Sequence, residues 1–380
     1  MTTYHHLYPF SPWGLHGGTL RLRTAVEASS LGGIAMLSWW DPMRSEWRSD
    51  VPVKSVGAPD PEPVAAPLET HASALKRHLF PFALWESGRA PRSRASRVLA
   101  EKPGATLVLH TTFLAPLAAG LRQSGRRVVV DVYDAIFRGH LDEAEGASIG
   151  MRAVRRAYAS SVRHRECGAL MPIPSLLAAG WDDARLLTGL GLQQIKWVPT
   201  GLEAQLSVMP EADRIHVGLL GNFNHTVTAR AASDLMASPL GSDPSVEIIL
   251  AGIGSERYDR SNHVRSLGRI ANTREFYDQV HAAVVPVTNG TGMKCKLGEA
   301  ALAGKAVITT RLGSVGYPPE LRRAFVVVDS AHSLNRSVVT DAIERTPPQA
   351  IRAKFEAVVG RKAAARAYAD VLENTAERLS

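Results

Sequence analysis

A glycine-rich stretch between two apolar runs constrains the fold more than any other feature of this chain. It covers residues 288–304, follows the apolar run 282–287 and precedes a second run at 306–310. This order predicts a strand, a glycine turn, a helix and a second strand, the unit of parallel α/β sheets. A helix start leaves backbone N–H groups without intrahelical partners, so the turn offers a site for an anion such as phosphate.

Charged residues at the predicted helix start indicate which kind of anion the site would bind. Lys294 and Lys296 add positive charge there, and Glu299 follows Lys296 on nearly the same helical face. A nucleotide-sugar would suit the site, because backbone and lysine hold phosphate while a carboxylate accepts hydrogen bonds from two sugar hydroxyls. The alternative is a solvated ion pair between Lys296 and Glu299, which would contribute only about 0.2–0.5 kcal/mol.

The alternation of strands and helices runs through two halves of the 380-residue chain. Further apolar runs lie at 34–37, 106–110, 127–131, 215–221, 245–252, 264–267 and 325–328. Length and alternation together predict an α/β protein of two Rossmann-like domains, with a ligand in the cleft between them. We place the N-terminal domain at 1–204, joined by a C-terminal helix at 361–380, and the C-terminal domain at 205–360.

Composition narrows the class of protein. A net charge of +8 favours an anionic partner, or else reflects an arginine-rich composition without one. Cys167 and Cys295 have no companion at metal-ligand spacing, and no apolar run of about 18 residues occurs. We therefore expect a cytoplasmic protein of bacterial composition, with contact at a membrane surface left open. The proline-rich segment 41–67 is predicted to be a long loop, either at an acceptor entrance or without function.

The chain resembles the family 4 glycosyltransferases of the GT-B fold. The matching motifs, in chain order, are Gly17-Gly18, 130–134, 198–201, 218–223 and 290–304. Each motif is weak alone, but their order is fairly specific. The resemblance implies a retaining, metal-independent enzyme that moves a sugar from a nucleotide diphosphate sugar to an acceptor hydroxyl. It also implies a donor mainly in the C-terminal domain, an acceptor mainly in the N-terminal domain, and a last helix that crosses back.

Residue by residue, the resemblance assigns a donor site to the glycine-rich stretch. Lys296 matches the family's diphosphate-binding lysine, with a catalytic role, and Glu299 matches its ribose-binding glutamate. The helix-start groups that would face phosphate and sugar are Gly292, Met293 and Lys294. Thr291 stands where many members have a glutamate that touches the sugar. A threonine cannot accept two hydroxyls as a carboxylate does, so the sugar is not specified.

A second departure from the family lies after the run 215–221. Many relatives have an Arg and a Lys there that clamp the diphosphate, and neither appears at that spacing, although Arg230 follows on the next predicted helix. Asn222 or His225 would contact the donor instead. The alternative is that Asn224 caps the next helix.

The N-terminal half contributes candidates at the ends of predicted strands. His110 matches a histidine that lies near the transferred sugar in relatives, and its role is either catalytic positioning or purely structural. Asp131 and Asp134 would bind an acceptor hydroxyl or act as structural caps. Gly17 and Gly18 would bring backbone amides to the donor, or form a plain turn.

Other enzyme classes lack their motifs here. Neither a metal-protease, serine-hydrolase or Walker motif nor an Asp-x-Asp pair occurs, so we expect no metal and no cofactor beyond the substrate. The expected partners are a nucleotide-sugar and a small-molecule, lipid-linked or glycan acceptor, without nucleic acid. The alternatives are a GT-B nucleotide-sugar epimerase or hydrolase, or a non-catalytic nucleotide- or polyanion-binding relative.

Overall fold

The computed structural model describes residues 2–8, 17–41, 46–48, 104–123, 125–145, 148–259 and 263–377. Most of the segment 41–67, expected to be a loop, lies outside these residues. The chain divides into two compact units. Unit 1 comprises Met1–Phe137, Arg156–Gly201 and Ala364–Ser380, and unit 2 comprises Arg138–Arg155 and Leu202–Ala363.

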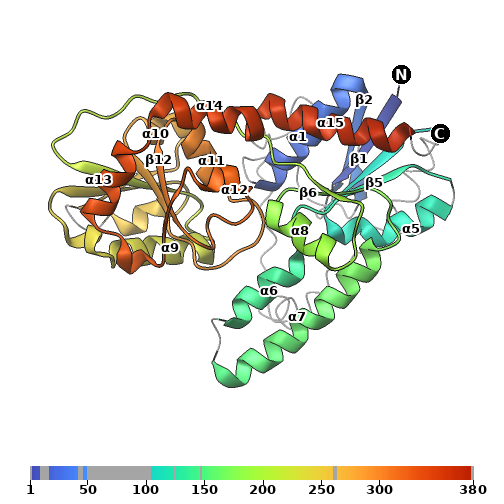
Figure 1. The fold of residues 1–380 in the computed structure, drawn as a ribbon, viewed down its shortest axis with the longest axis horizontal. Helices are drawn as coiled ribbons and strands as arrows, with labels where there is room; N and C mark the ends of the chain where they lie inside the picture. Colours follow the sequence, from blue (N-terminus) through green and yellow to red (C-terminus); the bar gives the residue numbers. More distant parts are fainter. Residues whose placement is uncertain are drawn as a thin grey trace. The chain divides into compact units, whose positions relative to one another are not determined.

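Unit 1 is built on a seven-stranded sheet of order β3-β2-β1-β4-β5-β6-β7 (Figure 1). Its strands are β1 (Thr2–Tyr8), β2 (Gly33–Asp41), β3 (Glu46–Arg48), β4 (Thr106–His110), β5 (Val128–Asp131), β6 (Leu176–Ala178) and β7 (Ile195–Trp197). All pairs are parallel except β2 with β3. Every residue of β4 and β5 is buried, as expected for strands covered on both faces.

The helices of unit 1 include one that is buried on almost every side. They are α1 (Gly17–Gly32), α5 (Ala115–Gln123), α8 (Trp181–Gly189) and parts of α6 (Ile136–Glu145) and α7 (Ile149–Leu170). The sequence of residues 14–33 predicts a glycine turn followed by an amphipathic helix, but the polar residues Arg21, Thr24 and Ser29 of α1 are buried too. Such burial is tolerated because each makes hydrogen bonds; Thr24 Oγ1, for example, accepts from the Gly201 amide at 2.9 Å.

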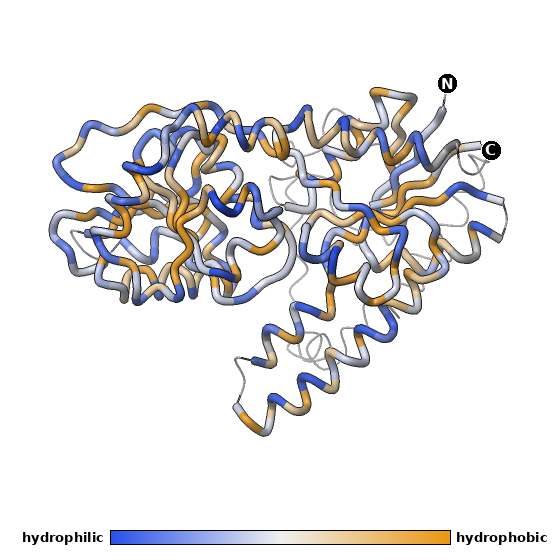
Figure 2. Tube along the Cα trace, in the orientation of Figure 1, coloured by the Kyte–Doolittle hydropathy of each residue, from blue (hydrophilic) through white to orange (hydrophobic). Residues whose placement is uncertain are grey.

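Unit 2 contains a six-stranded, wholly parallel sheet of order β10-β9-β8-β11-β12-β13. Its strands are β8 (Ile215–Leu220), β9 (Val246–Ala251), β10 (Val264–Gly268), β11 (Ala282–Val285), β12 (Ala306–Thr310) and β13 (Val326–Val328). Its helices include α9 (Thr226–Met236), α10 (Thr273–Tyr277), α11 (Cys295–Leu302), α12 (Pro319–Arg322), α13 (Arg336–Glu344) and α14 (Pro348–Val359). Figure 2 shows the sheet as the most hydrophobic part of this unit.

The last helix, α15 (Arg361–Glu377), returns the chain to unit 1. Tyr368 and Leu372 of this helix share a core cluster with Ala25 and Ala28 of α1. The two Rossmann-like units and the returning helix confirm the predicted GT-B fold class. Among the helices that the structure describes, none combines the length and the apolar character needed to cross a bilayer.

Candidate functional site

The strand order of unit 2 reverses between β8 and β11. The chain runs outward from β8 to β9 and β10, then returns to pair β11 with the other side of β8. In open parallel sheets, ligands bind beyond the carboxyl ends of the strands at such a switch point. The loops that leave these two strand ends carry Asn222 and residues 291–294, and Lys296 follows in the first turn of α11, so the fold brings both predicted donor segments to one sheet edge.

The loop after β11 is held in shape by Lys294. Gly290 has φ 111° and Gly292 has φ 69°, a conformation that favours glycine. Lys294, the N-cap residue of α11, turns its ammonium back and donates to the carbonyls of Gly290, Thr291 and Gly292 at 3.0, 2.9 and 3.0 Å. Its charge therefore neutralises the carbonyl side of the turn, a supporting role that the sequence did not reveal.

Lys296 and Glu299 form an ion pair on the first turn of α11. Lys296 Nζ lies 2.9 Å from Glu299 Oε2, with 34% of the lysine side chain and 8% of the glutamate side chain exposed. Burial alone would lower the pKa of Lys296, but the charge and hydrogen bond of Glu299 outweigh it and raise that pKa. The pair therefore differs from the solvated alternative, because one partner is almost buried and the lysine stays charged.

Tyr317 braces the start of α11 and was missed by sequence reasoning. Its hydroxyl donates to the Lys294 carbonyl and accepts from the Gly298 amide, both at 2.9 Å. Burial raises the pKa of Tyr317 well above its usual value. Beside it, Gly316 has φ 101°, and a Cβ there would lie 2.6 Å from the Met293 Cα. A tyrosine in the loop after β12 gives no sequence signal for this contact.

The loop after β8 is short and closely packed. Asn222 Oδ1 accepts from the Asn224 amide at 3.0 Å. Helix α9 begins at Thr226 with His225 as its N-cap residue, and no side chain caps it. The alternative that Asn224 caps this helix is therefore wrong, and Asn224 and His225 are both exposed.

In unit 1 the strand order reverses between β1 and β4, and His110 ends β4. Its side chain is fully buried. Nε2 lies 3.0 Å from Nδ1 of His6, and Nδ1 lies 3.2 Å from the hydroxyl of Tyr133. Burial, with a smaller effect of the Arg21 charge, lowers the pKa of His110 to about 3, so the ring is neutral. In this conformation His110 has no exposed atom with which to touch a sugar.

The hydrogen bonds of this cluster fix the tautomers of both histidines. The Ser29 hydroxyl donates to the Ala25 carbonyl at 3.0 Å, so it accepts from His6 Nε2 at 2.9 Å. His6 Nδ1 then accepts from His110 Nε2, and the unprotonated His110 Nδ1 shares the single proton of the Tyr133 hydroxyl with the Gly18 carbonyl. The Tyr133 hydroxyl also lies 3.3 Å from the Gly18 carbonyl, in the first turn of α1.

Asp131, predicted either to bind an acceptor hydroxyl or to act as a structural cap, is completely buried in this structure. Arg21 donates to both of its oxygens at 2.9 Å, and the Tyr368 hydroxyl donates to Oδ2 at 3.0 Å. Arg21 also donates to the carbonyls of Val198 and Pro199. The carboxylate thus joins β5, α1 and α15. Asp134, three residues later, is half-buried.

Two strained residues lie just beyond the carboxyl ends of β4 and β5. Thr111 has φ 70° and Tyr133 has φ 69°, and within the described ranges they are the only non-glycine residues with positive φ. Thr111 Oγ1 is also buried without a hydrogen-bond partner. Strain of this kind persists where surrounding structure enforces it and clusters at functional sites. Sequence reasoning did not single out either residue, because backbone strain leaves no local pattern.

The described part of the chain contains no group of three or more His, Cys, Asp or Glu residues placed to hold a metal ion.

Comparison with known proteins gives one family match and many structural neighbours. Residues 214–340 match the family model described as Glycosyl transferases group 1. Sucrose-phosphate synthase from Thermosynechococcus elongatus has a TM-score of 0.71 and 15% identity, with both chains covered completely. HepE from Anabaena, solved with UDP-glucose, has a TM-score of 0.62 and 14% identity over 98% of this chain and 99% of its own.

A third neighbour is α,α-trehalose 6-phosphate synthase from Burkholderia multivorans, with a TM-score of 0.60, 12% identity and complete coverage of both chains. At these identities the likeness establishes the fold. No curated protein matches the sequence significantly.

Proposed function

We propose that this chain, a glycosyltransferase of the GT-B fold whose residues 214–340 form a glycosyl transferases group 1 domain, uses a nucleotide diphosphate sugar and glycosylates an acceptor hydroxyl with retention and without metal. The observation that carries the proposal is the start of α11. There a charged lysine and an almost buried carboxylate lie at the switch point of the unit 2 sheet.

The chemistry of the donor site follows from this geometry. The first N–H groups of α11 and the ammonium of Lys296 bind the diphosphate, and they stabilise the negative charge that develops on it as the sugar leaves. When Lys296 turns to the phosphate, Glu299 can accept hydrogen bonds from the two ribose hydroxyls. Lys294 keeps its three carbonyl contacts and so holds the turn in its binding shape. Thr291, Met293 and Asn222 remain proposed contacts of the donor.

In unit 1 we assign substrate contact to Tyr133 rather than directly to His110. Neutral His110 accepts from the Tyr133 hydroxyl and orients it, while the phenol oxygen keeps lone pairs that can accept from a substrate hydroxyl. Burial raises the pKa of Tyr133, so the phenol stays protonated. His110 is then a positioning residue. Gly17, Gly18 and the half-buried Asp134 remain proposed contacts at the same edge of the sheet.

The test is calorimetric binding of nucleoside diphosphates, beginning with UDP because HepE was solved with UDP-glucose. Lys296→Ala removes a charge-assisted contact worth about 1.5–3 kcal/mol, so affinity should fall roughly 10- to 150-fold. Lys354→Ala, an exposed lysine on α14, is the matched control and should bind normally. Unchanged binding by Lys296→Ala would refute the assignment of the donor site.

Product analysis tests the reaction itself. Transfer to an acceptor with the donor's anomeric configuration, unaffected by EDTA, is the expected result. Free sugar or an epimer formed without any acceptor would instead indicate a hydrolase or an epimerase.

A further inference from the structure

Helix α6 contains a glycine in its interior, at position 139. Glycine weakens a helix interior relative to alanine, so such a position usually has a packing or functional reason. Gly139 belongs to the segment Arg138–Arg155, which is part of unit 2. The reason for this glycine lies in what it contacts within that unit.

Gly139 lies directly against Thr291, in the loop after β11. A Cβ at position 139 would stand 3.3 Å from Thr291 Cγ2 and 4.0 Å from Thr291 Oγ1. The first distance is shorter than an ordinary contact between carbon atoms, which is about 3.5–4.0 Å. Only a glycine lets α6 approach this loop so closely, and the methyl group of Thr291 lies nearer to the helix than its hydroxyl does.

The main chain of Thr291 is fixed as well. Its carbonyl accepts from Lys294 Nζ at 2.9 Å, and it stands between Gly290 and Gly292, which both have positive φ. Because the methyl group occupies the space beside Gly139, the contact with α6 also restricts the rotamer of the threonine side chain. A β-branched side chain held in this way presents its hydroxyl in one fixed direction.

We propose that Gly139 is a positioning residue of the donor site. Its missing side chain makes room for the Thr291 methyl group, so that the Thr291 hydroxyl points to a hydroxyl of the donor sugar. A threonine hydroxyl donates one hydrogen bond and can accept others, which suits a neutral sugar hydroxyl. The inference rests on the proposed function, in which Thr291 contacts the donor, and adds the residue that orients it.

Calorimetry with UDP and UDP-glucose, the ligands found in HepE structures, tests this role. In Gly139→Ala the added methyl group pushes the Thr291 side chain out of its position. Affinity for UDP-glucose should fall about three- to tenfold, the equivalent of one neutral hydrogen bond. Affinity for UDP should not change, because Lys296 and Glu299 are untouched. Thr291→Val, which lacks the hydroxyl, should show the same pattern.

Thr291→Ser separates a positioning role from a purely structural one. Serine keeps the hydroxyl but lacks the methyl group that a Cβ at position 139 would touch. The double variant Gly139→Ala/Thr291→Ser should therefore bind UDP-glucose like Thr291→Ser alone. If the loss in Gly139→Ala arose elsewhere in α6, it would persist in the double variant. Melting curves establish that each variant is folded.

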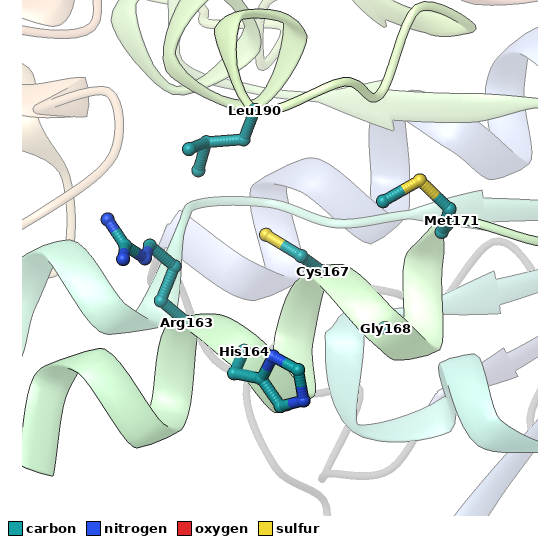
Figure 3. Close-up of a pocket in the computed structure, with 6 residues that line it drawn as sticks. All are labelled: Arg163, His164, Cys167, Gly168, Met171 and Leu190. Carbon is teal, nitrogen blue, oxygen red and sulfur yellow. The ribbon is translucent and has the colours of Figure 1, made fainter.

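Gly168 provides the matched control. It lies near the end of α7, beside a hollow of about 360 Å³ that is also lined by Cys167, Met171 and Leu190 (Figure 3). A Cβ at position 168 would have no described neighbour within 4 Å outside the helix itself. Gly168→Ala thus adds the same methyl group to a helix without a new contact, and it should bind both ligands like the wild type.

The outcomes separate this inference from the proposed function. Unchanged affinity of Gly139→Ala for UDP-glucose would overturn the inference, and so would a failure of Thr291→Ser to restore that affinity. Equal affinities of the wild type for UDP and UDP-glucose would overturn it too, because no group would then contact the sugar. If the wild type binds UDP and Lys296→Ala binds it more weakly, the proposed donor site stands whichever way the Gly139 variants behave. A wild type that bound neither ligand would contradict both.

Discussion

Replacing Asp131 by Asn separates a structural role from a substrate-binding role in unit 1. The carboxylate is fully buried and balances the charge of Arg21, whose side chain is 1% exposed. Asparagine keeps the shape and part of the hydrogen bonding but removes the negative charge. Arg21 would then remain as a buried cation without its counter-charge, because it also donates to two neutral carbonyls.

The size of the effect follows from that burial. Removing one partner of a buried ion pair costs about 3–5 kcal/mol, a large share of the roughly 5–15 kcal/mol that stabilises a typical domain. With a urea dependence of about 2 kcal/mol per M, the unfolding midpoint should fall by about 2 M. Tyr368→Phe removes one hydrogen bond to the carboxylate and should cost less, about 1.5–3 kcal/mol.

Urea unfolding followed by tryptophan fluorescence measures this effect selectively. All seven tryptophans belong to the residues of unit 1, so their signal reports the unfolding of that unit. Asp370→Asn, at an exposed position of α15, is the control and should change stability by less than about 0.5 kcal/mol. If Asp131→Asn retained wild-type stability but lost transfer activity, the structural reasoning would be refuted and the acceptor-binding prediction supported.

Three further substitutions test other parts of the structure. Tyr317→Phe removes the hydroxyl partner of the buried Gly298 amide, so the free energy of unfolding of unit 2 should fall by about 1–3 kcal/mol. Calorimetry should also show weaker binding of nucleoside diphosphates, and normal stability and binding would contradict the bracing role. Tyr133→Phe should lower kcat with donor affinity unchanged, and full activity would exclude a substrate contact through the phenol. Burial raises the pKa of Glu166 from 4.5 to about 7, so the folded state holds a proton that the unfolded state has lost, and stability falls as pH rises through this range. Between pH 5.5 and 8.5 the free energy of unfolding of the wild type should therefore fall by about 2 kcal/mol more than that of Glu166→Gln. Urea titrations measure this difference, and the same pH dependence of stability in both proteins would disprove the pKa shift.

Local sequence patterns were sufficient to predict most of the secondary structure. The apolar runs of the second half correspond to β8–β13, and the glycine turn before α11 has the positive φ angles that its glycines suggested. β1 was missed, although it lies in the middle of its sheet, because His5 and His6 interrupt the apolar run. They are tolerated there because Ser38, Ser29 and His110 supply hydrogen-bond partners from distant segments.

The sequence by itself determined the two α/β units, the helix start at Cys295 and the lysine and glutamate on its first turn, because these depend on neighbours within about four residues. Only the tertiary structure decided which polar residues are enclosed by the protein and which stay partly exposed. Asp131 and Tyr133 differ by two positions at one strand end, yet the first is enclosed by Arg21 and Tyr368 while the second is strained and only partly buried. The partners of Asp131 lie more than 100 residues away along the chain. The partners of Tyr133 lie in α1 and β4. A pattern of neighbouring residues does not indicate contacts between segments so far apart in the sequence. The burial and the hydrogen-bond partners of these residues are therefore set only when the sheet is assembled.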